Sequence, residues 1–321
     1  MEGGLKVIRI FKTIDGQTQK ISEPAAGSWV ALTDPTMEEL ATTADRFKID
    51  LDDLKSPLDE EERSRIQVED DYTLIILDIP TTDITQEKDI FYTIPFGIIV
   101  KDEIILTVCL VDTPILAIFM EGRVRNFSTT KRTRFIYQML YRNAEMFLQY
   151  LRIINKKSDE IEKKLHISQR NQELFDMLEL EKGLVYITTS LRGNEVVLEK
   201  LMRSTSITSI PRYEEDEELL EDVIIENKQA IEMGKIYSDI LSSTTDAYAS
   251  VISNNLNIVM KFLSVITIVL TVPTIMTGAF GMNVGGIPCN TNPYGFWIIS
   301  GVCVLVTLLV GVILGKNKYF K

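Results

Sequence analysis

Short strand-type runs of apolar residues alternate with short helical segments in the first third of the chain, and the chain after it has the pattern of long helices. Runs rich in β-branched and aromatic residues predict strands at "LKVIRIF", "SWVAL", "YTLIILDI", "FYTIPFGIIV" and "IILTVCL". Between them, "DPTMEELATTADRFKI" predicts a helix with Asp34 as its cap and Pro35 at its first position, and "VKDEI" predicts a hairpin turn. We therefore expect an α/β or α+β domain over residues 1–125, and take α/β as the fold class.

Long helices are predicted after this domain. Pro211 is the only proline between residues 131 and 257, and the segment is rich in Leu, Ile, Glu, Lys and Gln, which favour helices. A break near "HISQRN" and an end at "TSITSIPRYEE" divide residues 126–213 into two long helices. From residue 214 onward no stop signal precedes the end of an apolar run, so one continuous stalk helix is predicted over 214–281.

The end of the chain has the composition of a membrane hairpin. No Asp, Glu, Lys or Arg occurs between residues 262 and 315, although charged residues make up 25% of the chain. Residues 262–281 and 296–314 are each long enough, at about 1.5 Å per residue, to cross a hydrocarbon core of about 30 Å. Buried helices of a large soluble protein are the alternative. Two such runs around a short polar loop favour two spans, with an outer loop at 282–295, a second span at 296–315 and a basic tail at 316–321.

The flanks of the hairpin predict its orientation. A hairpin returns the chain to its starting side, and "MEGGLKVIRI" lacks the apolar segment of a signal peptide. We therefore expect both termini in the cytoplasm and the spans in the plasma (inner) membrane. Lys261 before the first span, and Lys316, Lys318 and Lys321 after the second, agree with the positive-inside rule.

The charge and the rare residues argue against several functions. The net charge is −12, and the three tail lysines leave −15 on residues 1–261, so this part attracts cations and repels nucleic acid. Cys109, Cys289 and Cys303 fall in a predicted strand, a loop and a span without ligand spacing, so no disulfide or zinc site is predicted. His166 is the only histidine, and no phosphate loop, nucleophile motif or metal-ligand cluster indicates an enzyme.

A polar seam follows one face of the predicted stalk helix and first span. At 100° per residue its members fall within about 100° of arc: Asp246, Ser253, Asn257, Ser264, Thr267, Thr271, Thr274 and Gly278. Such hydroxyls can bond the preceding turn or a neighbouring helix. The alternative, which we favour for the whole seam, is a water-filled path. One helix cannot enclose a path, so a symmetric homo-oligomer is predicted.

Two further residue types lie close to the seam. Met260 and Leu263 would either form a constriction that gates by dewetting or pack in a core. Lys261 would either line the path or extend to the headgroups.

The end of the first span carries a recognisable motif. Gly281-Met282-Asn283, followed by a second span and a basic tail, resembles the signature of the CorA family of magnesium transporters. The stretch "SNNLNIVMKFLSVITIVLTVPTIMTGAFGMN" is similar to the family's pore helix. This resemblance implies a funnel-shaped homopentamer with a cytosolic α/β domain and a two-span hairpin. It further implies entry of Mg²⁺ down its electrochemical gradient, with cobalt or nickel as side substrates and no organic cofactor.

The resemblance also implies roles for single residues. Gly281, Met282 and Asn283 would form the selectivity site at the outer mouth, Asn257 an inner asparagine ring, and Asp246 an acidic position in the funnel. Asp83 in "IPTTDIT" and Asp222 in "LLEDVII" would form a regulatory Mg²⁺ site between neighbouring copies, which closes the pore when internal Mg²⁺ is high. The outer loop "VGGIPCNTNPYG" departs from the family because it holds no acidic residue.

Three alternatives stay open at this point. A transporter of Zn²⁺, Co²⁺ or Ni²⁺ with the same fold is one, although Met282 favours magnesium. A membrane-anchored metal sensor that conducts nothing is the second, and the polar seam argues against it. For "EEDEELLED" at 214–222, a solvated helix start and a cation-sensing segment are equally compatible with the sequence.

Overall fold

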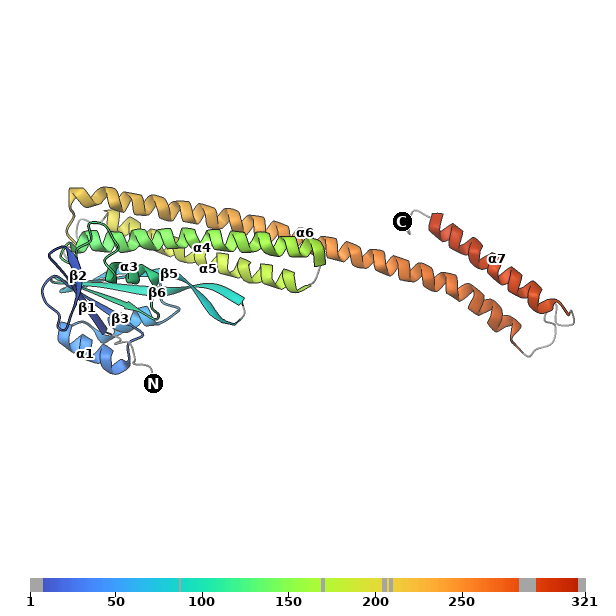
Figure 1. Ribbon diagram of the computed structural model, residues 1–321, viewed down its shortest axis with the longest axis horizontal. Helices are drawn as coiled ribbons and strands as arrows, with labels where there is room; N and C mark the ends of the chain where they lie inside the picture. Colours follow the sequence, from blue (N-terminus) through green and yellow to red (C-terminus); the bar gives the residue numbers. More distant parts are fainter. Residues whose placement is uncertain are drawn as a thin grey trace. The chain divides into compact units, whose positions relative to one another are not determined.

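The computed structural model (Figure 1) describes residues 8–86, 88–168, 171–203, 207, 210–282 and 293–316. Side chains are described for these residues except 83–86, 88–89, 166–168, 171 and 315. The chain divides into two compact units, Met1–Thr245 and Asp246–Lys321. Each unit is considered by itself.

A seven-stranded mixed sheet forms the centre of the first unit. Its strand order is β2-β1-β3-β7-β6-β5-β4, and the pair β3–β7 is parallel whereas the other pairs are antiparallel. The strands are β1 Ile8–Ile14, β2 Gln17–Ile21, β3 Ser28–Thr33, β4 Arg65–Val68, β5 Tyr72–Gln86, β6 Lys88–Lys101 and β7 Ile104–Cys109. The five predicted strands are confirmed, and so is the turn at "VKDEI", where Asp102 has a φ of 48°. The short polar strands β2 and β4 were not predicted.

Helices cover both faces of this sheet. On one face, α1 (Met37–Phe47), α2 (Leu51–Lys55) and the 3₁₀ helix η1 (Ser56–Leu58) close a core around Leu32, Leu40 and Leu106. On the other face, α3 (Pro114–Met120), α4 (Arg132–Ser168) and α5 (Asn171–Arg203) close a second core that contains Trp29 and Phe135. This arrangement confirms the predicted α/β domain, although its second core is completed by the long helices.

The start of α1 differs from the prediction. Thr36 caps the helix, accepting from the Glu39 N–H, while the Glu39 carboxylate accepts from the Thr36 N–H at 2.9 Å in a complete capping box. Asp34 has instead a φ of 48°, and its N–H donates to the Cys109 carbonyl. The predicted cap at Asp34 is therefore wrong, because this residue makes the left-handed turn that leads out of β3.

Asparagine side chains complete one edge of the sheet. The pairing of β4 with β5 stops at Arg65 and Ile76, because Arg65 is the first residue of β4. Strand β5 therefore has no strand neighbour on that side at Asp78. Asn194 of α5 replaces it: its Oδ1 accepts from the Asp78 N–H at 2.8 Å, and its Nδ2 donates to the Asp78 carbonyl at 2.9 Å. Asn143 of α4 donates to the same carbonyl at 2.8 Å. Side-chain amides thus fix α4 and α5 to the sheet.

The long helix α6 (Glu214–Phe280) confirms the predicted continuous helix and has residues in both units. In the first unit it runs antiparallel to α5. Asn227 donates to the Leu191 carbonyl at 3.1 Å, Gly234 lies against Thr188, and the Thr245 hydroxyl donates to Met177 Sδ. Residue numbers along α5 therefore decrease in the direction in which those along α6 increase.

The second unit contains the end of α6 and the helix α7 (Gly295–Lys316). Both are long and apolar enough to cross a membrane, with mean hydropathies of 2.2 and 2.7 in their most apolar windows. The two predicted spans are therefore present as helices. Cys303 lies on α7 as expected, whereas Cys289 lies outside the described residues.

Candidate functional site: a polar face of the membrane helix

The end of α6 has one face that α7 covers and one that it leaves open. A Cβ built on Gly311 of α7 would lie 4.0 Å from Val269 Cγ2. At 100° per residue, the half-buried residues of this part of α6 share the side of Val269: Val265, Val269, Val272, Pro273, Met276 and Phe280. The polar seam lies on the opposite side of the helix, so the chain's own second span does not cover it.

Every described member of the seam is exposed. These residues are Asp246, Ser253, Asn257, Ser264, Thr267, Thr271, Thr274 and Gly278. Near the seam, Met260 and Leu263 are 60% and 55% exposed. A Cβ atom added to Gly278 would have no neighbouring atom within 4 Å. Core packing of Met260 and Leu263 within one chain is therefore not observed. The exposed polar positions, unlike the apolar ones, are unfavourable against lipid, so they favour contact with water or with polar groups of another surface.

Four of the five seam hydroxyls donate to their own helix. Ser264 donates to the Met260 carbonyl at 2.8 Å, and Thr267 donates to the Leu263 carbonyl at 2.8 Å. Thr271 and Thr274 make the same bond one turn back, at 2.7 and 2.8 Å. Because the hydrogens of these four hydroxyls are used inside the helix, their oxygen lone pairs are what they offer to the surroundings. This part of the open face thus presents acceptors.

The glycine of the Gly-Met-Asn motif has a local reason. The Gly281 N–H donates to the Thr277 carbonyl at 2.9 Å, and a Cβ on Gly281 would approach that oxygen to 3.0 Å. A side chain would therefore crowd the last helical turn, although Gly281 is not among the residues with positive φ. Met282 is 55% exposed, and Asn283 lies outside the described residues.

The two predicted regulatory positions lie on different elements of the first unit. Asp222 is exposed on α6. Burial is the main reason why the pKa of Tyr141 is raised, and the negative charges of Glu145, Glu226 and Asp222 add to the rise in that order. Asp83 lies on β5 opposite Ile90, and the next residue of β6, Phe91, packs against Gly183 of α5. Gly183 is level with the α6 turn near residue 239, on the order of 20 Å along the helix from Asp222.

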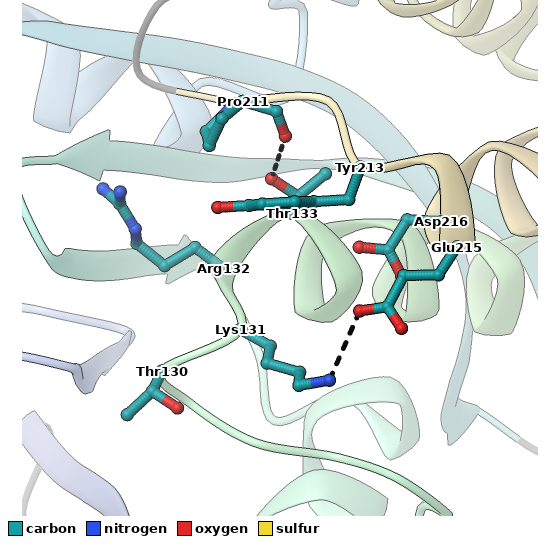
Figure 2. A pocket seen from close by; sticks show the side chains of 8 residues that line it. All are labelled: Thr130, Lys131, Arg132, Thr133, Pro211, Tyr213, Glu215 and Asp216. Atoms are coloured by element: carbon teal, nitrogen blue, oxygen red, sulfur yellow. Dashed lines mark hydrogen bonds and ion pairs between the residues drawn. The ribbon is translucent and has the colours of Figure 1, made fainter.

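The start of α6 is fixed to the start of α4 (Figure 2). Thr133 donates to the Pro211 carbonyl at 2.7 Å, Lys131 pairs with Glu215 at 3.4 Å, and Arg134 pairs with the buried Asp216 at 3.0 Å. Burial raises the pKa of Asp216, and the Arg134 charge opposes this rise. Among the charged residues that line the pocket drawn in Figure 2, Lys131 and Glu215 pair with each other, and Asp216 pairs with Arg134. These contacts fix the start of α6 to α4.

Sequence reasoning found the seam but not what separates it from the covered face. Within the described residues of one chain, no three His, Cys, Asp or Glu side chains gather as a metal site. The separation of faces depends on Gly311 and Val269, two residues without any chemical signal in the sequence. The arrangement offers an open line of neutral oxygen acceptors with a carboxylate, Asp246, at one end.

Comparison with known proteins identifies relatives of the whole chain. A family described as "CorA-like Mg2+ transporter protein" matches residues 25–316. The cobalt/magnesium transport protein CorA of Methanocaldococcus jannaschii is 32% identical over 291 residues, which are 88% of this chain and 87% of that protein. The complete structure of the CorA magnesium transporter from the same organism covers 98% of both chains, with a TM-score of 0.80 and 26% identity.

A more distant likeness concerns a shorter segment. The zinc transport protein ZntB of Yersinia pestis is 33% identical over 75 residues, 23% of either protein. This similarity is too short to describe the whole chain, and it keeps zinc among the ions that a transport experiment has to include.

Proposed function

Since the chain belongs to the CorA family of divalent-cation transporters, we propose that five copies form a ring that conducts Mg²⁺ into the cell down its electrochemical gradient. The observation that carries this proposal is the position of the seam on the face of α6 opposite Val269, where α7 does not cover it. A polar face within a membrane span is unfavourable against lipid. Facing other copies around a central path removes that cost.

The chemistry of the seam suits a hydrated Mg²⁺ ion. Mg²⁺ gives up its water reluctantly, and the hydrogens of its bound waters point outward as donors. The oxygens of Thr267, Thr271 and Thr274 are free to accept because their hydrogens are bonded within the helix. Neutral acceptors hold such an ion weakly enough for release, whereas a ring of carboxylates in the centre would bind it tightly. The ion then passes with its water shell.

Amide oxygens bracket this path in the proposal. Asn257 forms the inner ring, and Asn283 forms the outer selectivity site together with Gly281 and Met282. The helix continues for 23 residues from Asn257 to its end at Phe280, about 35 Å, and Asn283 follows three residues later in the sequence, so we place the two asparagines on either side of the hydrocarbon layer. Asp246 collects cations on the cytoplasmic side. Met260 and Leu263, both exposed in one chain, form the constriction that dewets when the pore is closed.

The membrane ends of the helices fit an orientation with both termini in the cytoplasm. Aromatic residues gather at the start of α7, where Tyr294, Phe296 and Trp297 are 69–73% exposed, as in the belt at a membrane surface. Lys316 ends the helix, and Lys261 precedes the first span. We place the aromatic end outside and the lysines inside.

Regulation by internal Mg²⁺ is the finer part of the proposal. Mg²⁺ bound at cytosolic carboxylates would offset their repulsion between copies and hold the ring closed. Asp83 and Asp222 are the proposed positions. Asp83 lies on β5 and Asp222 on α6, at different heights measured along the axis of α6. Each position is therefore tested by itself, with Asp83→Asn and Asp222→Asn measured separately. A position that senses Mg²⁺ shifts the internal concentration at which uptake stops, and two unchanged variants would place the sensor elsewhere.

Uptake into proteoliposomes tests the transport proposal. Mg²⁺ entry, followed with a trapped dye, is expected for the wild type and should be lost in Asn283→Ala. Thr271→Val removes one seam acceptor at constant shape and should lower the flux. Thr307→Val is its matched control, because Thr307 makes the same bond to its own helix on α7, at 2.7 Å to the Cys303 carbonyl.

The outcomes separate the alternatives. Equal losses in Thr271→Val and Thr307→Val would show that the hydroxyls only support helix structure, and the seam would not be the path. Entry of Zn²⁺ or Co²⁺ without Mg²⁺ would keep the pore and change the substrate. If none of these ions enters when the membrane potential is negative inside the liposomes, the transport proposal is refuted and the anchored sensor is favoured.

A further inference from the structure

Helix α5 carries a line of exposed apolar side chains on the face turned away from its own chain. Phe175, Val185, Tyr186 and Val196 are each 54–65% exposed, and Leu178 is 41% exposed. At 100° per residue they fall on one side of the helix, opposite the buried Leu184, Leu191 and Leu198. The exposed cations Lys182 and Arg192 lie in the same line. We name these seven residues the α5 stripe.

Helix α6 carries a second line of mixed character in the same unit. Ile225, Ile236 and Ile240 are 53–60% exposed, and the exposed acids Glu232 and Asp239 lie between them. This side of α6 is opposite the buried Val223, Ala230 and Gly234, which face the chain's own helices. We name these five residues the α6 stripe. Ile236 and Ile240 lie one turn apart and form an exposed apolar patch with Asp239 beside it, the composition of an interaction surface.

The two stripes match in order and in charge. Antiparallel contacts of Leu191 with Asn227, Thr188 with Gly234 and Met177 with Thr245 fix which residues share a level, since both helices rise about 1.5 Å per residue. By interpolation between the last two contacts, two pairs lie level within about one residue: Tyr186 with Ile236, and Lys182 with Asp239. An apolar residue is thus level with an apolar residue, and a cation is level with an acid.

The partners in these pairs do not meet within one chain, because each stripe points away from the helix that packs beside it. None of Lys182, Arg192, Glu232 and Asp239 forms an ion pair among the described residues. A rotation about an axis parallel to α6 leaves every level unchanged. The α5 stripe of one copy is therefore level with its complement on the α6 stripe of the next copy.

We propose that the α5 stripe of one copy packs on the α6 stripe of its neighbour, with Tyr186 against Ile236 and Lys182 beside Asp239 at the contact. The proposal rests on the ring of copies proposed above and names the surfaces that build it. The contact is heterologous, since each copy uses two different faces, and a heterologous contact forms a ring when its rotation closes. Pairing two α5 stripes would instead bring Lys182 and Arg192 of both copies together, so a two-fold dimer through this face is disfavoured.

Cysteine cross-linking tests the contact in the full-length protein. The double variant Tyr186→Cys with Ile236→Cys, with Cys109, Cys289 and Cys303 replaced by Ala, is oxidised or treated with a short bis-maleimide. Because every copy carries both halves of the contact, a ladder of covalent products up to the full ring is expected. Tyr186→Cys or Ile236→Cys alone gives monomers if the contact is as proposed. Dimers from Tyr186→Cys alone would overturn it, because they require α5 to meet α5.

Charge reversal provides a second test that does not need a covalent bond. Lys182→Glu should raise the protein concentration at which half of the rings dissociate in detergent, by about fivefold for an exposed pair made repulsive. Adding Asp239→Lys should restore the wild-type midpoint. Lys156→Glu, an exposed reversal on α4 away from both stripes, is the matched control and should leave the midpoint unchanged.

The results distinguish this inference from the transport proposal. A stable ring without α5–α6 cross-links, and with no rescue by Asp239→Lys, would overturn the contact and leave the ring intact. A protein that is monomeric by native mass spectrometry yet still transports Mg²⁺ would overturn both the contact and the ring. Rings that cross-link and transport support both.

Discussion

Removing the Asn194 side chain tests the idea that side-chain amides complete the edge of the sheet. In Asn194→Ala, the Asp78 N–H loses the partner that accepts from it at 2.8 Å, and Ser64 loses an acceptor at 3.2 Å. The Asp78 carbonyl keeps the Asn143 donor at 2.8 Å. One partly buried N–H is therefore left without a partner, and two further bonds are lost.

The size of the effect follows from these bonds. An unpaired buried donor costs about 1–3 kcal/mol, and each ordinary hydrogen bond contributes about 0.5–1.5 kcal/mol. We expect a loss of about 3 kcal/mol in the free energy of unfolding, which for a unit of this size lowers Tm by roughly 6–12 °C. The loss is measured by thermal and chemical unfolding in detergent, with exchange of the Asp78 amide hydrogen as the local readout.

Asn143→Ala is the matched control for this prediction. Its Nδ2 is one of two donors to the Asp78 carbonyl, and its buried Oδ1 has no partner among the described residues. Removing a side chain that is only half satisfied costs less, about 1 kcal/mol. If Asn143→Ala were as destabilising as Asn194→Ala, or if the Asp78 amide exchanged at the wild-type rate in Asn194→Ala, the proposed substitution of a strand by an amide would be wrong.

Three further predictions concern the first unit. Gly97→Ala should lower stability by about 1–3 kcal/mol in chemical unfolding, because a Cβ there would lie 2.3 Å from Pro57 Cγ; a variant as stable as the wild type would contradict this packing. Burial raises the pKa of Asp78, and the hydroxyls of Ser190 and Ser64 oppose the rise. The folded state therefore binds the proton more tightly, and stability is lost as the pH rises from the unfolded pKa through the folded one. Asp78→Asn should abolish this loss in unfolding measured across acidic pH, and an unchanged pH dependence would refute it. Thr36→Ala should cost about 1 kcal/mol in the same assay by removing the cap of α1, and no cost would show that the capping box is not stabilising.

The parts of the fold that follow from local pattern were predictable from the sequence. The strands around Trp29, Ile75 and Ile99 are apolar and β-branched, and the helix from 214 to 280 has no signal that would end it. The polar strand β2 and the short strand β4 have no such pattern, since they form because a neighbouring strand offers its edge. The cap of α1 was misplaced by two residues because Asp34, Pro35 and Thr36 all favour a helix start. Only the course of β3 into the turn at Asp34 decides between them.

Contacts between distant residues could not be predicted in this way. Nothing near Asn194 in the sequence indicates that it bonds Asp78, 116 residues away. The same limit applies to the site, where the members of the seam were identified by their period. Which face of the helix α7 covers depends on the approach of Gly311 to Val269. The stripes on α5 and α6 likewise become visible only when burial shows which apolar residues are left outside.

The two interpretations of the polar seam, hydroxyls bonded to their own helix and the proposed water-filled path, are compatible. Hydroxyls that bond their own helix are usually considered structurally neutral, and Thr267, Thr271 and Thr274 do make those bonds. The bond uses only the hydrogen, however, and leaves the oxygen lone pairs directed away from the backbone. A hydroxyl without this bond could rotate and donate to an anion. Once the bond fixes its hydrogen, the hydroxyl can act only as a hydrogen-bond acceptor. In the proposed ring, such acceptors would attract the water hydrogens around a hydrated cation and would offer no hydroxyl donor to an anion.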